Sequence, residues 1–298
     1  MRPRRPLRSM AAIISLGAVL GATPILTSAA SAAPIQIDRF YLAVGASESV
    51  GVQPAVNSSH GGPTSEGYAN DLVELEAARG VTLQLTQLGC PGESTSTVVS
   101  GADHCYHTGN SQLADAVAFL TAHYDQPGLV SIDLGFNDLR SCIHHEFTDL
   151  NCVNTQVATV RAQLTTIVQI LRAAAGPQVI FVGLNHNNPY LANAINSTHD
   201  VNFATNSTYA INSLNAALSD VYRSFNIPVA NVAGFFANSV RAPMRVPRLG
   251  RVPMNEARAC TWTWMCRNGT GGPNMHPNDA GYKVIADAIA AALPPLNS

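Results

Sequence analysis

The chain has 298 residues, of which 46% are hydrophobic and only 12% are charged, with 17 basic and 19 acidic side chains. Four of the basic residues lie within the first eight positions, so the remainder holds 13 basic and 19 acidic residues, a net charge of −6. Such a balance excludes a nucleic-acid partner and a protein that binds anionic membranes through its charge.

The first segment of the chain has the pattern of a secretory leader. Residues 1–32 begin with arginines, continue with an apolar run and end with small side chains. This order is typical of a signal peptide, which we expect to be cleaved after Ala32 or Ala33. Residues 33–298 are enough for one large domain and contain no apolar run of about 18 residues. We therefore expect a single exported domain over 33–298, without a stable membrane anchor.

Beyond the leader, short apolar runs alternate with helical patterns. Runs that end in glycine or polar residues occupy 39–47, 81–89, 128–138, 178–186 and 227–236. Spacings of three and four between apolar residues predict helices over 153–175, 211–225 and 284–292, and Gly176-Pro177 is a typical helix stop. This alternation predicts an α/β domain with a mostly parallel, five-stranded sheet covered on both faces. The stretch 234–272, rich in Pro, Arg, Asn and Gly, is predicted to be a long loop.

Six cysteines follow the leader. An even number in an exported protein is typical of disulfides, and neighbouring couples would each close a short loop. The expected pairs are Cys90–Cys105, Cys142–Cys152 and Cys260–Cys266. Metal binding is the alternative, because His104 and His107 flank Cys105. The chain lacks the CxxC and HExxH spacings of common metal sites, so we expect no metal and no cofactor.

Three predicted strands end in residues that could carry chemistry. Ser47 follows the first strand in "AVGASESVG", Gly92 follows the second in "LGCPGEST", and Asn137 follows the third in "LGFNDL". Each could instead be a helix cap, a turn glycine or an Asx turn. Ligands gather at the carboxyl edge of parallel sheets, however, and His276 in "NMHPNDAGY" precedes the last helix. Together these positions favour one site.

The order Ser47, Gly92, Asn137, His276 resembles the SGNH (GDSL-type) hydrolase family, whose name gives these four residue types. "GFND" is similar to its GxND motif and "HPNDAGY" to the segment around its catalytic histidine. The resemblance implies a flavodoxin-like, three-layer α/β/α sandwich and the hydrolysis of esters. The sequential cysteine pairs also resemble those of secreted actinobacterial members.

The resemblance implies a role for each residue. Ser47 attacks the acyl carbon, while His276 takes its proton and returns it to the leaving alcohol. The N–H groups of Ser47 and Gly92 and the Asn137 amide bind the oxyanion of the acyl-enzyme reaction. The expected protein is a secreted, monomeric esterase or lipase acting on a lipid or simple acyl ester.

Two positions depart from the family pattern. Ala46 stands where the first motif has an aspartate, and Pro273 and Asn274 stand where an acid normally orients the histidine. We expect a main-chain carbonyl of Pro273 or Asn274 to accept the Nδ1–H instead, with an amide oxygen as the alternative. With His276 as the cap of the last helix, Asp279 is expected to face that helix's free N–H groups.

Other functions stay open at this stage. A carbohydrate acetylesterase of the same fold is one alternative, and a binding module that has lost its activity is another, suggested by the missing acid. An α/β-hydrolase is disfavoured because the GxSxG elbow is absent. Trp262 and Trp264 could line a substrate groove, but we expect them to pack the Cys260–Cys266 loop against the core.

Overall fold

The computed structural model describes residues 37–296, except 56–60, 102–103, 107–108, 145–146, 197–198, 248 and 268–270. The leader expected over 1–32 and the residue His107 lie outside the described residues. Contacts between Cα atoms group Ile35–Ser298 into one compact unit. Within the described part of the chain, no helix is both long and apolar enough to cross a membrane.

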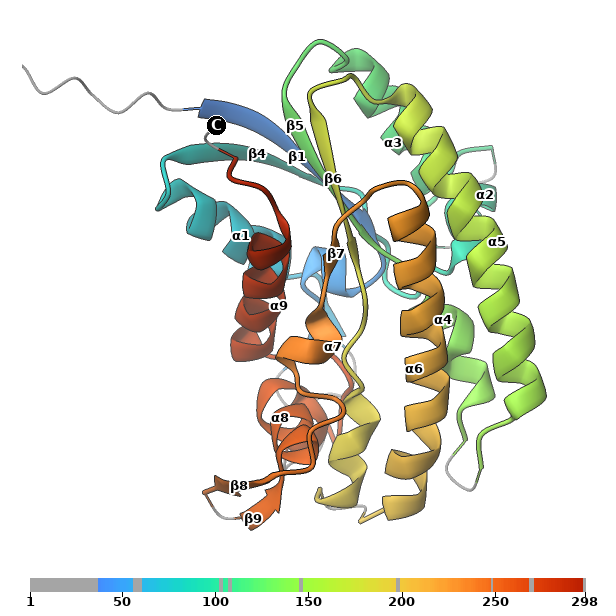
Figure 1. The fold of residues 1–298 in the computed structure, drawn as a ribbon, viewed down its shortest axis with the longest axis vertical. Helices are drawn as coiled ribbons and strands as arrows, with labels where there is room; N and C mark the ends of the chain where they lie inside the picture. The colour runs from blue at the N-terminus through green and yellow to red at the C-terminus, as the bar shows by residue number, and fades with distance from the viewer. Residues whose placement is uncertain are drawn as a thin grey trace, which may run out of the picture. The chain divides into compact units, whose positions relative to one another are not determined.

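A five-stranded parallel sheet forms the centre of the fold, in the order β4-β1-β5-β6-β7 (Figure 1). Its strands are β1 Ile37–Gly45, β4 Val81–Gln87, β5 Gly128–Asp133, β6 Val179–Leu184 and β7 Val229–Ala230. Each overlaps a run predicted to be a strand, and β1 begins two residues before its run. Numbered along the chain, the order is 2-1-3-4-5, which is that of flavodoxin-like sheets. The predicted α/β class and sheet are confirmed.

Helices cover both faces of this sheet. The longer ones are α1 Tyr68–Ala77, α3 Gln112–Ala122, α5 Leu150–Ala174, α6 Val201–Ser224, α8 Met254–Trp262 and α9 Asp279–Ala292. The shorter ones are η1 Glu48–Val50, α2 Thr95–Ser100, α4 Phe136–Leu139, η2 Arg140–Cys142, η3 Pro189–Ala194, α7 Val232–Phe235 and η4 Trp264–Cys266. Two small antiparallel pairs complete the structure: β2 Gln53–Pro54 with β3 Gly61–Gly62, and β8 Pro243–Val246 with β9 Gly250–Pro253.

Alternating side chains of each strand supply two apolar cores. Phe40, Leu42 and Val44 of β1 pack in the core under α3, α5 and α6, while Tyr41 and Ala43 point to the core under α1 and α9. Figure 1 shows these two groups of helices on opposite sides of the sheet. Each fully buried aliphatic side chain contributes roughly 1.5–3 kcal/mol. The sheet is therefore held between two layers, as the three-layer prediction requires.

The long helix α5 shows why the periodic prediction worked. Asp149 caps its first turn by accepting from the Cys152 N–H at 3.0 Å. Buried apolar residues then recur along one side at helical spacing, among them Val160, Leu164 and Leu171. The helix ends at Ala174, just before the predicted stop at Gly176. The helix is therefore defined by a cap at its N-terminus, an apolar stripe along one side and a stop signal after its C-terminus.

The prediction of a long loop over 234–272 is wrong. This stretch contains the β8–β9 hairpin and the helix α8. The buried side of α8 includes Ala259 and Cys260, which pack against Leu191 and Ala192 of η3. Because these partners lie about 70 residues earlier in the chain, the local sequence pattern does not reveal them.

The structure contains three disulfides: Cys90–Cys105, Cys142–Cys152 and Cys260–Cys266. These are the sequential pairs expected from the sequence. A sulfur bonded in a disulfide is not a thiolate, so Cys105 does not offer a metal ligand in this state. Each bridge closes a short loop, of 15, 10 and 6 residues in separation.

Gly183 tests the packing of β6 against α6. A Cβ at Gly183 would lie 2.3 Å from the Tyr222 ring, whose hydroxyl donates to the Ile132 carbonyl at 3.2 Å. We expect Gly183→Ala to lower the free energy of unfolding by about 1–3 kcal/mol, since the ring must move. The matched control is Gly62→Ala, because a Cβ at Gly62 meets nothing within 4 Å. Urea denaturation that ranks the two variants equally would contradict this account.

Candidate active site

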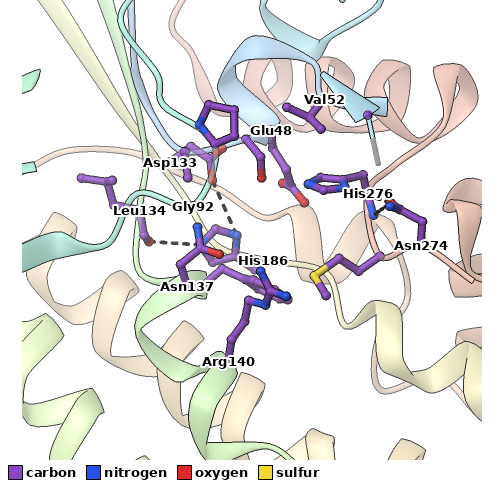
Figure 2. Close-up of a pocket in the computed structure, with 16 residues that line it drawn as sticks. Glu48, Val52, Gly92, Asp133, Leu134, Asn137, Arg140, His186, Asn274 and His276 are labelled. Atoms are coloured by element: carbon purple, nitrogen blue, oxygen red, sulfur yellow. Dashed lines mark hydrogen bonds and ion pairs between the residues drawn. The ribbon is translucent and has the colours of Figure 1, made fainter. Parts of the chain in front are cut away.

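The order of the strands brings the ends of β1 and β5 together. In an open parallel sheet, ligands bind where the strand order reverses, and this sheet reverses between β1 and β5. A cavity of about 300 Å³ lies there (Figure 2). It is lined by the segments that follow β1, β4, β5 and β6 and by the segment before α9. All four residues singled out from the sequence line it: Ser47, Gly92, Asn137 and His276.

Ser47 lies in the turn between β1 and η1. The pairing of β1 with β5 ends at Gly45 and Asp133, where a Cβ on Gly45 would come within 2.7 Å of the Asp133 carbonyl oxygen. The next N–H, that of Ala46, donates to the same oxygen at 3.1 Å. The Ser47 side chain makes no capping hydrogen bond to η1. Its place is therefore not explained by helix capping, and no described residue accepts its N–H.

Gly92 occupies the turn between β4 and α2. Its φ of 89° lies in the left-handed region, which other residues rarely adopt. A Cβ at this position would meet nothing within 4 Å, so the backbone conformation alone requires glycine. Within the described residues, the Gly92 N–H has no hydrogen-bond acceptor. The turn thus presents a free donor at the cavity.

Buried polar side chains hold these turns to one another. The Gln112 side chain accepts from the Gly45 N–H at 2.7 Å and donates to the Gly45 carbonyl at 2.9 Å. It also donates to the Glu93 carboxylate at 3.0 Å. The Asn137 amide donates to the Glu93 carbonyl at 2.9 Å. Since that amide carries two N–H groups, one remains for the cavity, and Asn137 is a bridge between two turns rather than an Asx turn.

A second bridge involves Asp138, the residue after Asn137. Its carboxylate accepts from the Thr95 hydroxyl at 2.6 Å and from the Thr95 N–H at 3.1 Å. This joins the start of α4 to the start of α2. The "GEST" and "GFND" segments are therefore fixed relative to each other by bonds between residues 43 and 44 positions apart.

His276 lies before α9, with its ring held by Asn274. The ring Nδ1 lies 2.8 Å from Asn274 Oδ1, and the His276 main-chain N–H donates to the same oxygen at 3.0 Å. Because an amide oxygen only accepts, Nδ1 carries the proton and Nε2 keeps its lone pair. Burial, and then the nearby Arg140 guanidinium, lower the pKa of His276 to about 4. The ring is therefore a neutral base over most of the pH range.

The structure corrects two expectations about this segment. The acceptor for Nδ1 is the side-chain oxygen of Asn274, not a main-chain carbonyl of Pro273 or Asn274. The helix α9 begins at Asp279 and is capped by Asn278, whose side chain accepts from the Gly281 N–H at 3.1 Å, so His276 is not the cap. Asp279 accepts from Gln53 Nε2 at 2.7 Å, far along the chain.

The Cys260–Cys266 loop braces the histidine segment. The Trp264 N–H donates to the His276 carbonyl at 3.0 Å, and the Trp264 carbonyl accepts from the Asn274 N–H at 3.2 Å. Trp262 packs against the core formed with α9. Neither tryptophan is among the residues that line the cavity. The groove alternative for this pair therefore has no support, and Trp264 positions His276 through the main chain.

Three residues at the cavity were missed from the sequence. Glu48, Asp133 and His186 bring together two carboxylates and an imidazole, with one ligand atom of each within 4.8 Å of the others. Burial raises the pKa of Asp133, and burial together with the Asp133 charge raises that of Glu48. The sequence offered one signal for this group: Asp133, an acid at the end of the apolar run that forms β5. Their proximity depends on the strand order, which the sequence does not state.

Comparison with known proteins places the chain near lipases and esterases. Residues 25–289 match the profile of the GDSL-like lipase/acylhydrolase family. The structure is similar to an extracellular lipase from Streptomyces rimosus, with 18% identity and a TM-score of 0.58, over 86% of this chain and 100% of the other. It is also similar to phospholipase A1 from Streptomyces albidoflavus, with 18% identity and a TM-score of 0.55, over 86% and 99%.

An aryl esterase of M. smegmatis shares 12% identity with a TM-score of 0.50, over 86% of this chain and 100% of the other. At such identities these likenesses establish the fold only. No curated protein sequence matches significantly.

The low pKa of His276 can be measured directly. In NMR titrations of the His276 ring we expect a midpoint of about 4, below the ordinary 6.5. Arg140→Gln removes the nearby cation and should raise this midpoint. Arg161→Gln is the control, because Arg161 pairs with Asp220 on the surface at 3.0 Å and should leave it unchanged. A wild-type midpoint near 6.5 would contradict the partly buried, neutral ring.

Proposed function

The chain belongs to the GDSL-like lipase/acylhydrolase family. From this premise we propose that it hydrolyses carboxylic esters through Ser47 and His276, by way of an acyl-enzyme intermediate. The observation that carries the proposal is the meeting of both residues at one cavity with Gly92 and Asn137, and with His276 already held in the tautomer of a base.

The first step uses the free lone pair of His276. Nε2 accepts the Ser47 hydroxyl proton while Oγ bonds to the acyl carbon, and the resulting imidazolium then protonates the leaving alcohol. Water then attacks the acyl-enzyme while His276 takes a proton from it. His276 returns this proton to Ser47 Oγ, and the carboxylic acid leaves. Asn274 Oδ1 keeps Nδ1–H in place throughout. It stabilises the imidazolium less than a carboxylate does, because it carries no charge.

The oxyanion that forms on the substrate needs donors which are not already engaged. The N–H groups of Ser47 and Gly92 have no acceptor within the described residues, and the Asn137 amide has one N–H left after its bond to Glu93. Each such donor contributes about 3–4 kcal/mol to the transition state in comparable hydrolases. These three groups support a preformed oxyanion hole.

Apolar side chains at the same cavity support an acyl substrate. Val52, Leu134, Phe136 and Met275 line it next to the polar groups. A lipid or simple acyl ester fits such a lining better than an acetylated sugar, whose hydroxyl groups need polar partners. The leader expected over 1–32 and the three disulfides support a protein that acts outside the cell.

Removal of the nucleophile tests the proposal. We expect Ser47→Ala to abolish the hydrolysis of p-nitrophenyl acetate and octanoate, with unchanged circular dichroism, because the proposed acyl-enzyme forms on the Ser47 hydroxyl. Ser65→Ala, an exposed serine of the same chain, is the matched control. Wild type, but not Ser47→Ala, should also react with a fluorophosphonate probe. Full activity in a folded Ser47→Ala protein would exclude this nucleophile, and an unreactive wild type would favour a lapsed binding module.

Substitutions at Asn274 test the orienting hydrogen bond. Asn274→Ala removes the acceptor of Nδ1–H, and we expect kcat to fall by about 100-fold or more, towards the 10⁴ scale of a lost tautomer. Asn274→Asp supplies a carboxylate at the same place and should keep most of the activity. Asp279→Ala is the control, since Asp279 bonds Gln53 and not the ring. A loss below tenfold in Asn274→Ala would show that another oxygen orients His276.

A further inference from the structure

A group of three polar side chains next to Ser47, two of them buried, is not used by the proposed hydrolysis. Glu48 follows the nucleophile, Asp133 ends β5, and His186 lies two residues beyond β6. Figure 2 shows them at the cavity, with Asp133 and His186 joined by a dashed line. A carboxylate oxygen from each acid and one ring nitrogen all lie within 4.8 Å of one another.

Among the described residues, the only ion-pair contact recorded for these carboxylates lies within the group, between His186 Nδ1 and Asp133 Oδ1 at 3.6 Å. Asp133 and His186 are only 2% and 3% exposed. Within the described part of the chain, no lysine or arginine forms a salt bridge with Glu48 or Asp133, and Asp133 Oδ2 has no hydrogen-bond partner. Two carboxylates in a medium of low dielectric repel each other strongly. Either bound protons or a positive ion must therefore balance their charge.

The histidine has the orientation of a metal ligand. His186 Nε2 lies 3.1 Å from the Leu134 carbonyl, which only accepts, so Nε2 carries the proton. The lone pair of Nδ1 therefore faces Asp133 Oδ1, at 3.6 Å. Metal-bound histidines usually donate their other N–H to a main-chain carbonyl or carboxylate in this way. The Leu134 bond thus fixes the ring with its free nitrogen towards the carboxylates.

The 3.6 Å separation argues for an ion rather than a shared proton. A hydrogen bond between these atoms would measure about 2.7–3.2 Å. Two ligands of one tetrahedral zinc ion, each at about 2.0–2.2 Å from the metal, lie roughly 3.3–3.6 Å apart. The distance therefore fits two atoms that share a metal, and the Glu48 carboxylate lies within 4.8 Å of both.

We propose that Glu48, Asp133 and His186 bind one divalent transition-metal cation at the floor of the cavity. A doubly positive ion with two carboxylates and a neutral imidazole has no net charge. Mixed nitrogen and oxygen ligands suit zinc or manganese better than calcium or magnesium. The second cluster with ligand-type atoms, Cys90, His104 and Cys105, has both sulfurs in a disulfide and cannot compete.

The position next to Ser47 gives such an ion a role. Uncompensated carboxylates beside the oxyanion hole would oppose the negative charge of the transition state, whereas a neutral metal site would not. Both carboxyl groups must lose their protons to bind the ion, so affinity should rise with pH. The site itself rests on residues outside the proposed Ser47–His276 pair and stands without it.

Metal binding by the full exported chain tests the proposal. After treatment with EDTA, we expect calorimetry at pH 8 to detect one zinc ion per chain, with manganese weaker, and elemental analysis to agree. Glu48→Gln, Asp133→Asn and His186→Gln should each weaken binding at least tenfold. Glu74→Gln, at an exposed acid, and Ser47→Ala should bind as wild type does.

Two further readouts keep the outcome decisive. Cobalt bound to the wild type should give visible absorption bands that change in His186→Gln and stay in Ser47→Ala. Glu48 is partly exposed, so Glu48→Gln should fold even where a variant of buried Asp133 does not. The metal site would be overturned if the wild type bound no stoichiometric zinc. It would also be overturned if folded Glu48→Gln and His186→Gln bound zinc with the affinity of the wild type. An ester-inactive wild type that binds zinc would overturn only the proposed function.

Discussion

The pairing of β1 with β5 at Gly45 and Asp133 is the contact on which the rest of the site depends. It sets the two strand ends side by side, so that the turns carrying Ser47 and Asn137 leave the sheet at one point. The lack of a side chain at Gly45 permits the approach, because a Cβ would meet the Asp133 carbonyl. The turn that carries Gly92 is attached to this pair through Gln112, which bonds both main-chain groups of Gly45 and the Glu93 carboxylate. The sheet therefore sets the relative positions of the turns that carry Ser47 and Asn137.

Rigidity at the cavity comes from polar bonds and not from apolar packing alone. Glu93 accepts hydrogen bonds from Gln112 and Asn137, and Asp138 accepts one from Thr95. These bonds fix the relative positions of turns that lie far apart in the sequence. The histidine arrives separately, on a segment braced by Trp264. Preorganised donors lower a barrier only if they need not move during the reaction, and this network provides that condition. The neutral amide of Asn274 holds the His276 ring, at a position where the family pattern leads one to expect an acid.

The sequence was informative where a local pattern is itself the cause of the structure. The strands are continuous apolar runs because both faces of the sheet are buried, and α5 has its cap, stripe and stop in consecutive residues. The helix α8 was missed because its stability comes from contacts with η3, which no local window contains. Which oxygen of Asn274, main-chain or side-chain, accepts from the His276 Nδ1–H depends on the rotation of the Asn274 side chain, which the sequence does not give. Glu48, Asp133 and His186 follow three different elements, and only the strand order brings them together.

The three disulfides share a property that bears on how the chain reaches this state. In each, a cysteine is joined to its nearest cysteine neighbour along the sequence, over 15, 10 and 6 residues. Closing a loop costs less entropy the shorter the loop, so random oxidation favours these pairs over the crossed ones. A chain whose N-terminus emerges first can thus form one disulfide before the next pair of cysteines appears. No incorrect disulfide then has to be exchanged. In that order, the bridges beside Gly92 and Trp264 close before the last helix is added.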